Sequence, residues 1–187
     1  MAEHGLLPTT PLGARAPRRD VVGPVLVEEA VGVALASLAA RRGREAEVAA
    51  RAAEMGIPLP PPGRAAEGHP WGAFWTGPEA WMIEAPLATH EDVVAQLGPV
   101  FGEAASITEQ TDAWARFEVE GPLRPLFERL CNLDLARFGP GSATRTLVEH
   151  VGCFAVRRGP ERMTVLGPRS SAGSLHHALL TAARSAF

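Results

Sequence analysis

The chain has 187 residues, the length of one ordinary domain, and its 46% hydrophobic and 21% charged content is typical of soluble globular proteins. The formal net charge of -3 gives no sign of a nucleic acid or an anionic membrane as a partner, so we expect neither. All 18 cationic side chains are arginine, which excludes a Schiff-base lysine and the lysine of a phosphate-binding loop.

The two cysteines, Cys131 and Cys153, lie outside any CxxC pair. Isolated thiols of this kind are predicted to be reduced, buried side chains rather than zinc ligands. No apolar run approaches the roughly 20 residues of a membrane span, and the N-terminus lacks the apolar core of a signal peptide. We therefore expect a cytoplasmic protein.

Residues 1–28 are predicted to form an irregular N-terminal arm, because four prolines interrupt them and three arginines make them locally basic. Such a segment buries too little apolar surface to order by itself. It is therefore either a flexible tail or an arm that becomes ordered against a partner. The remaining residues, 29–187, are predicted to form a single domain.

Residues 31–38 are apolar and small, and they fit either a strand or a buried helix segment, because periodicity does not separate the two. Residues 44–55 are predicted to be helical, since Val48 and Ala52 fall on one face and a glycine follows as a stop signal. Consecutive prolines make residues 58–63 an extended linker.

A β-hairpin is predicted next, with strands at residues 71–76 and 81–85 joined by a short turn that contains Gly-Pro. Thr89 is predicted to cap a helix that runs to Leu97. The two acidic residues that follow Thr89 would lie in the first turn, where they suit the helix dipole.

Two further strands are predicted at residues 104–108 and 113–120. Apolar and charged side chains alternate in the second one, as is typical of a half-buried strand. Pro122 is predicted to occupy the first position of a helix, where its missing N–H costs nothing. From Leu123 to Leu130 four apolar side chains recur with helical spacing, which indicates a core-facing stripe.

Three strands at residues 143–151, 153–158 and 162–166 complete the predicted sheet, and Ser170 or Ser171 caps a C-terminal helix. Strand pairs joined by short turns favour antiparallel pairing. We therefore predict an α+β fold, with antiparallel sheets and packed helices, rather than a doubly wound parallel sheet.

No known catalytic or nucleotide-binding motif is found in the sequence. His176 and His177 are adjacent on a predicted helix, so they point about 100° apart and do not form the i, i+4 pair of a zinc site. Arg169 precedes Ser170 at a helix start, where capping explains the serine and anion binding is the alternative. We assign no catalytic, cofactor-binding or metal-binding residue.

Four tryptophans stand out in a chain that is poor in aromatic residues: Trp71, Trp75, Trp81 and Trp114. Core packing is one interpretation of these side chains. A partner interface is the second, because tryptophan is enriched at interface hot spots. A stacking site for a pterin or flavin ring is the third.

Four segments of the chain carry short motifs that occur together in one order. Trp75 with G-P-E-A-W-M-I (77–83) resembles the signature W-x-GP-x-x-W-L, and T-E-Q-T-D-A-W-A-R-F-E-V-E-G-P (108–122) resembles DQSDG…L-x-L-x-GP. The run L-C-N-L-D-L…F-G-P-G-S-A-T-R-T-L (130–147) is similar to the continuation of that pattern, and G-P-R-S with S-L-H-H-A-L-L (167–180) to its closing helix. Together these segments resemble the sarcosine oxidase gamma-subunit family. Thr111 stands where that family usually has serine, and His176 where tryptophan is common.

The resemblance implies a fold like the folate-binding domain of aminomethyltransferases. It also implies a role as the non-catalytic gamma subunit of a heterotetramer with alpha, beta and delta subunits. That flavoenzyme demethylates sarcosine to glycine, forms hydrogen peroxide and passes the one-carbon unit to tetrahydrofolate. Its FAD, FMN, NAD and zinc are expected on the other subunits, and none on this chain.

Two alternatives remain open. The chain could be a stand-alone folate-binding or one-carbon-transfer protein, for which Asp112, Glu118 and Asp134 are the available carboxylates in the resembling region. It could also belong to a related oxidase complex that acts on another N-methyl amine. The sequence of this chain does not separate the amine substrates, because the flavin subunit selects them.

Overall fold

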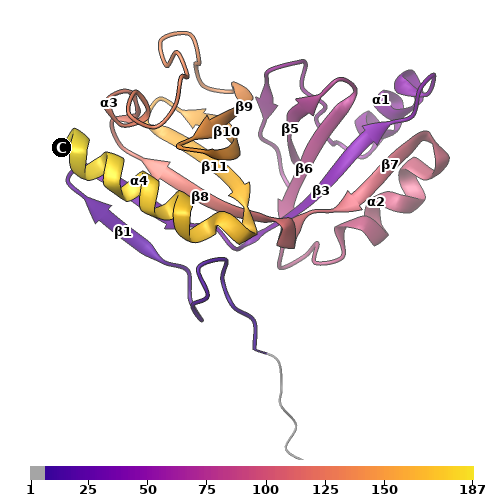
Figure 1. The fold of residues 1–187 in the computed structure, drawn as a ribbon. Coiled ribbons are helices and arrows are strands. Elements are labelled where there is room, and N and C mark those ends of the chain that lie inside the picture. Colours follow the sequence, from indigo (N-terminus) through magenta and orange to yellow (C-terminus); the bar gives the residue numbers. More distant parts are fainter. Residues whose placement is uncertain (1–6) are drawn as a thin grey trace, which may run out of the picture.

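The computed structural model describes residues 7–187 as two antiparallel sheets with helices on their outer faces (Figure 1). The six-stranded sheet has the order β1 (Arg19–Val22), β2 (Val25–Glu29), β8 (Trp114–Glu120), β11 (Arg162–Pro168), β10 (Val151–Gly159), β9 (Ala143–Val148). The five-stranded sheet has the order β4 (Ala65–Ala66), β5 (Gly72–Gly77), β6 (Ala80–Pro86), β3 (Val33–Ala40), β7 (Ala105–Glu109). Every strand pair is antiparallel, which confirms the predicted α+β class.

The helices divide between the two sheets. The five-stranded sheet carries α1 (Glu45–Glu54) and α2 (Val93–Phe101), and the six-stranded sheet carries α3 (Leu123–Phe127) and α4 (Ala172–Ala186). Three short 3-10 turns complete the described chain: η1 (Gly102–Ala104), η2 (Thr111–Ala113) and η3 (Arg169–Ser171). For residues 31–38 the sequence allowed either a strand or a buried helix. The structure shows a strand from Val33 onward, because β3 pairs with β6 on one side and with β7 on the other.

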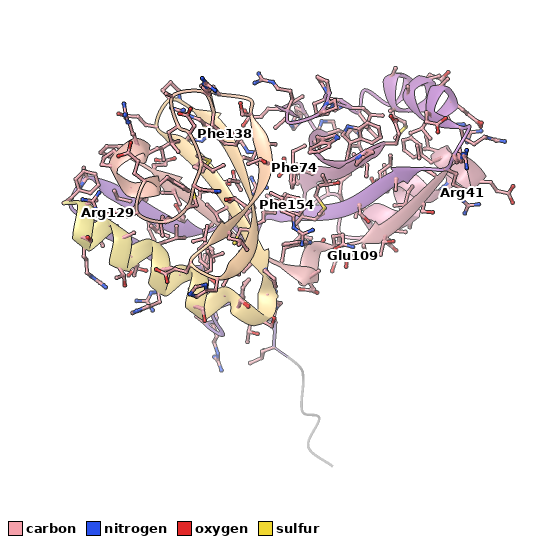
Figure 2. The ribbon with its side chains drawn as sticks, turned by 45° about the horizontal axis from the view of Figure 1, so that its top comes forward. Arg41, Phe74, Glu109, Arg129, Phe138 and Phe154 are labelled. Atoms are coloured by element: carbon pink, nitrogen blue, oxygen red, sulfur yellow. The ribbon has the colours of Figure 1, made fainter. Side chains whose placement is uncertain are left out.

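Three hydrophobic clusters follow from the alternation of side chains along the strands. One lies between the six-stranded sheet and its helices, and a second between the five-stranded sheet and its helices. The third joins the inner faces of the two sheets, where the rings of Phe74 and Phe154 lie 5.5 Å apart (Figure 2). The two sheets therefore pack on one another as well as on their own helices.

Several predicted helix ends are wrong. Asp92, not Thr89, caps α2, since its carboxylate accepts a hydrogen bond from the Ala95 N–H at 2.9 Å. The hydroxyl of Thr89 instead donates to the Pro86 carbonyl. Pro122 precedes α3 as its cap residue and is not its first helical residue. At α4 the cap residue is Ser171, but no serine side chain makes a capping hydrogen bond.

The predicted irregular arm over residues 1–28 is wrong for its second half. β1 and β2 form a hairpin there, and β2 pairs with β8 in the register Val27↔Val119. Val25 and Val27 are buried, and the alternate positions Leu26 and Glu28 are only half-buried. This alternation was hidden because the segment is short and lies among prolines and arginines. Residues 1–6 of the predicted arm lie outside the described part of the chain.

The segment of residues 7–18 is fastened to the six-stranded sheet by one buried carboxylate. Glu29 Oε1 accepts the Leu12 N–H at 2.9 Å, and Oε2 accepts the Arg18 N–H at 2.7 Å. Arg169 adds a bond from its Nη2 to the Thr9 carbonyl at 2.9 Å. The segment is thus ordered by contacts within this chain.

Replacing Glu29 by alanine is expected to release this segment, because two backbone N–H groups lose their acceptor at a cost of about 1–3 kcal/mol each. Trypsin should then cleave after Arg15 and Arg18 faster than in the unmodified protein, as mass spectrometry of timed digests would show. Glu28→Ala is the matched control, since the Glu28 side chain is 46% exposed and makes only a 3.8 Å contact with Arg19. Equal cleavage of the two variants would contradict the role of Glu29.

Candidate functional site between the two sheets

The inner faces of the sheets present an apolar half and a polar half. Positions on six strands form the apolar half, which has these buried members: Leu35, Phe74, Met82, Ala143, Phe154, Val156 and Leu166. Continuing along the same alternation, β6 presents Glu84, β8 presents Arg116 and Glu118, and β10 presents Arg158. The predicted half-buried strand 113–120 is therefore correct for its apolar side chains, but Arg116 faces the other sheet and is only 12% exposed.

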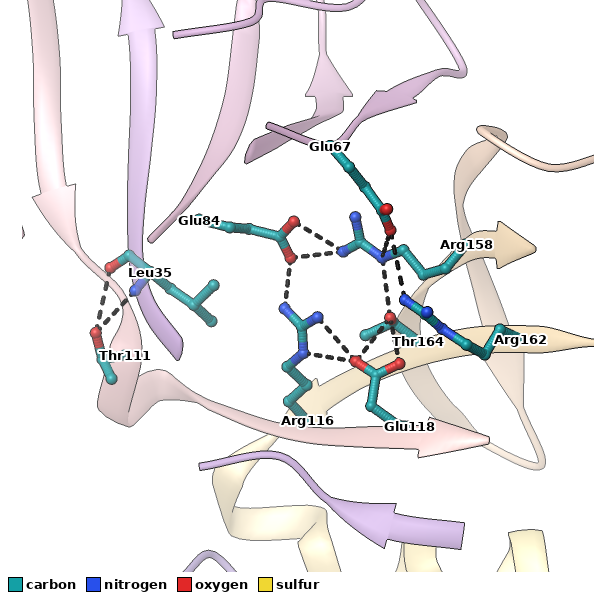
Figure 3. A network of polar contacts seen from close by, with 9 residues as sticks. All are labelled: Leu35, Glu67, Glu84, Thr111, Arg116, Glu118, Arg158, Arg162 and Thr164. Atoms are coloured by element: carbon teal, nitrogen blue, oxygen red, sulfur yellow. Dashed lines mark hydrogen bonds and ion pairs between the residues drawn. The ribbon is translucent and has the colours of Figure 1, made fainter. Parts of the chain in front are cut away.

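A polar network connects these charged side chains across the junction (Figure 3). Glu84 Oε1 accepts Arg116 Nη1 at 2.5 Å and Arg158 Nη2 at 2.6 Å, and its Oε2 accepts Arg158 Nη2 at 2.8 Å. On the other side Arg116 donates through Nε to Glu118 Oε1 at 2.9 Å. Thr164 closes the network, because its hydroxyl contacts Glu118 at 2.9 Å and accepts from Arg158 Nε at 3.0 Å.

The charged side chains of the network stabilise one another in their ionised forms. Burial alone would raise the pKa of Glu84, but the guanidinium groups of Arg116 and Arg158 outweigh it and hold that pKa below its ordinary value. Burial would likewise lower the pKa of Arg116, and the carboxylates of Glu84 and Glu118 reverse this effect. Glu84 is thus an ionised carboxylate whose two oxygens are both bound by arginine.

This arrangement is unsuited to acid–base chemistry and well suited to holding two sheets together. A general base needs a pKa near the working pH and a free oxygen toward its substrate. Glu84 offers neither, and Glu118 shares its oxygens between Arg116 and Thr164. The contacts join β6 of one sheet to β8 and β10 of the other.

Two cavities flank Arg116. The first, of about 310 Å³, lies between residues 8–17, the start of β3 and the turn η2, with Trp114 and Arg169 in its wall. The second, of about 350 Å³, is lined by polar groups that include Glu67, Glu84, Arg158 and Arg162. Val33 and Arg116 line both of them.

The structure does not gather the three predicted carboxylates into one site. Asp112 lies on η2 at the first cavity, is 87% exposed, and pairs with Arg169 at 3.1 Å. Glu118 belongs to the network between the sheets. Asp134 lies in the loop after α3, where its carboxylate accepts the Ala136 N–H and pairs with Arg137. Sequence reasoning missed Glu84, Arg116 and Arg158, because only the packing of two sheets brings them together.

The two departures from the family pattern have physical explanations. The Thr111 hydroxyl accepts the Leu35 N–H at 2.9 Å and donates to the Leu35 carbonyl at 3.4 Å, and a serine hydroxyl would make the same bonds. His176 is buried on α4, where its Nε2 contacts Asp20 Oδ2 at 2.9 Å. Its ring also packs against Phe117, so the imidazole fills an aromatic position and ties β1 to α4.

Each tryptophan has a packing or hydrogen-bonding role in the fold. Trp71 is buried and packs edge-on against His90, with ring centroids 4.6 Å apart. Trp75 and Trp81 face each other in the predicted hairpin, which the structure confirms as β5 and β6. Trp81 Nε1 donates to the Pro60 carbonyl at 2.8 Å, and Trp114 Nε1 donates to Gln110 at 3.1 Å. Trp114 alone among the four lines the first cavity.

The remaining candidates do not form a ligand set in the described chain. His177 contacts Thr181 on its own helix, away from the Asp20 contact of His176. Over residues 7–187 no three His, Cys, Asp or Glu side chains lie close enough together to hold a metal ion. Among the helices of the same residues, none has the length and apolar character needed to cross a membrane.

The thiols are free, and burial raises the pKa of Cys131 and raises that of Cys153 to about 11. Since the thiolate is the reactive form, we expect Cys153 to react with a disulfide reagent at pH 8 roughly a hundredfold more slowly than an unfolded cysteine. The Cys131→Ser variant isolates Cys153 for this rate measurement, and the same variant in guanidinium chloride is the reference. Equal rates in the two conditions would contradict the burial of Cys153.

Comparison with solved structures shows which fold this is. The chain superposes on one chain of the heterotetrameric sarcosine oxidase from Corynebacterium sp. U-96, solved in complex with pyrrole 2-carboxylate, with a TM-score of 0.74. The sequence identity is 23%, and the match covers 86% of this chain and 84% of the other. Glycine cleavage system aminomethyltransferase T from Bartonella henselae matches with a TM-score of 0.58 and 12% identity over 83% of this chain and 48% of that one. The sequence matches no protein-family profile and no curated protein.

These matches identify the fold of the chain: it is the fold shared by a sarcosine oxidase chain and aminomethyltransferase T. It agrees with the fold that the family resemblance implied. The chain spans nearly the whole of the oxidase chain that it matches but about half of aminomethyltransferase T.

Proposed function

We propose that this chain is the gamma subunit of a heterotetrameric sarcosine oxidase and that it supports the flavin-bearing chains without catalysing a step itself. The observation that carries this proposal is the fold match, at a TM-score of 0.74, over 84% of a chain from an enzyme of that kind. A match of this extent to an oxidase chain is expected of an equivalent subunit, whereas aminomethyltransferase T is about twice as long as its matching part.

The segments that resemble the gamma-subunit family support the same assignment. They fall on the β5–β6 hairpin, on β8 with the glycine after it, on the loop after α3 with β9, and on the start of α4. These are places where the fold depends on particular residues, such as the Trp75↔Trp81 pair and the Thr111 bonds to Leu35. The family pattern thus coincides with structural requirements of this fold.

In this role the partners are the alpha, beta and delta subunits. They carry FAD, FMN, NAD and zinc, and the assembled enzyme demethylates sarcosine with formation of glycine, hydrogen peroxide and 5,10-methylenetetrahydrofolate. This chain contributes a rigid surface: both sheets are tied together by the buried network around Glu84. The edge strands β1 and β9 carry the exposed apolar side chains Val21 and Leu147, which suit contact with other chains.

The test is an affinity purification of the tagged full chain from its own organism, followed by mass spectrometry and an absorbance scan. We expect three co-purifying chains, a flavin spectrum and peroxide production that depends on sarcosine. The tag alone, purified from the same lysate, is the control. A colourless eluate that contains this chain alone would contradict the proposal.

A stand-alone folate-binding or one-carbon-transfer protein is the second candidate, and the fold shared with aminomethyltransferase T favours it. Calorimetric titration of the purified chain with tetrahydrofolate separates the two. Binding by the isolated chain would support this candidate, and the absence of heat would remove it. If the chain belongs to an oxidase complex for another N-methyl amine, the co-purified enzyme should produce peroxide with that amine instead of with sarcosine.

A further inference from the structure

The first cavity has the size and the lining of a small-molecule site. Its volume of about 310 Å³ lies near the lower end of the roughly 300–1,000 Å³ that such sites occupy. Val33, Leu35, Leu87 and Trp114 give it an apolar lining. Leu35 is buried, so the cavity reaches an apolar side chain that can contact the body of a compact ligand.

The charged groups that line this cavity are mainly positive. Arg15, Arg116 and Arg169 line it together with one acidic residue, Asp112. Arg116 is fully engaged by Glu84 and Glu118, but the other two arginines are not. Arg169 uses Nη1 for Asp112 and Nη2 for Thr9, which leaves donors of its five N–H groups available.

Arg15 stands at the same cavity, is exposed, and makes no ion pair or side-chain hydrogen bond with any residue between 7 and 187. Guanidinium groups bind carboxylates through paired, charge-assisted hydrogen bonds. Arginine donors beside an apolar cavity are therefore complementary to a molecule that has an anionic end and an apolar body.

We propose that this cavity binds a compact organic anion, with its carboxylate held by Arg169 and Arg15 and its planar apolar body placed against Trp114 and Leu35. The residues 8–17 form one wall of the site, so Glu29, which fastens that segment, maintains its shape. This inference goes beyond the proposed subunit role and does not depend on it, because every contact comes from this chain.

The test is calorimetric titration of the full chain, together with any chains that co-purify with it, using 2-naphthoate as the probe. We expect a dissociation constant below about 1 mM, and binding of the neutral 2-naphthalenemethanol about tenfold weaker, since a charged hydrogen bond is lost. Arg15→Gln should weaken 2-naphthoate binding by about the same factor, and it removes no ion pair or side-chain hydrogen bond within residues 7–187.

Two further variants complete the experiment. Val31→Trp adds a large side chain at a partly exposed position of the cavity wall and should abolish binding of both probes. Arg184→Gln, on α4 and outside the cavity lining, should leave binding unchanged. No heat with 2-naphthoate, equal affinity for the acid and the alcohol, or unchanged affinity in both Arg15→Gln and Val31→Trp would overturn the proposal.

Discussion

Replacing Glu84 by alanine is expected to destabilise the protein by about 3–5 kcal/mol, because it leaves Arg116 and Arg158 as buried charges without their shared partner. The side chain of Arg158 is only 3% exposed, so its charge is poorly solvated once the carboxylate is removed. Urea unfolding at pH 7, followed by circular dichroism, measures the change in the free energy of unfolding.

Glu67→Ala is the matched control for this prediction. Glu67 contacts the same arginine, Arg158, but at 4.0 Å and with a side chain that is 59% exposed. Exposed ion pairs contribute about 0–1 kcal/mol, so this variant should unfold nearly as the unmodified protein does. If Glu84→Ala and Glu67→Ala lost the same stability, the network would not be what holds the sheets together.

Acid provides an independent check on Glu84. Its folded-state pKa lies below the ordinary value of 4.5, so its ionised form stabilises the folded protein above that pH. The contribution is lost as the pH falls through the folded-state pKa. The stability difference between the unmodified protein and Glu84→Gln should therefore be full at pH 7 and shrink as the pH falls below the ordinary value of 4.5.

Local patterns predicted most of the elements of this fold correctly. The alternation around Phe117 and the Gly77-Pro78 turn of the hairpin were strong local signals, and the strands that they predicted are present. The hairpin β1–β2 was missed because each strand has only four or five residues, and its pairing partner β8 lies about 90 residues further along the chain. Short strands of this kind are determined by long-range pairing, which local patterns do not reveal.

The site was harder to predict than the fold. Arg116 and Glu118 lie on the charged side of an alternating strand, and such a side normally faces water. The structure places that side against the second sheet. There Arg116 binds Glu84, which lies more than 30 residues earlier in the chain. Glu84 itself stood within an apolar strand, W-M-I-E-A, and this buried acidic residue in an apolar run was the one available signal.

The Gly121-Pro122 pair shows how a sequence pattern can be correct for a reason that the sequence does not reveal. The pattern predicted a helix start at Pro122, and a helix does follow. Gly121, however, has a φ of +128°, and a Cβ atom there would lie 2.5 Å from the Pro24 carbonyl oxygen. The glycine is required because the β1–β2 turn packs directly on the end of β8.

Gly121→Ala is therefore expected to destabilise the protein by roughly 3 kcal/mol or more, since it combines backbone strain with a contact that only a backbone shift can relieve. Gly173→Ala, in α4, is the matched control: a Cβ there meets no atom within 4 Å, and alanine is the better helix former. Urea unfolding should show a large loss for the first variant and no loss for the second. A Gly121→Ala protein as stable as the Gly173→Ala protein would mean that the β1–β2 hairpin does not pack on β8, and the cavity wall formed by residues 8–17 would then lose its support.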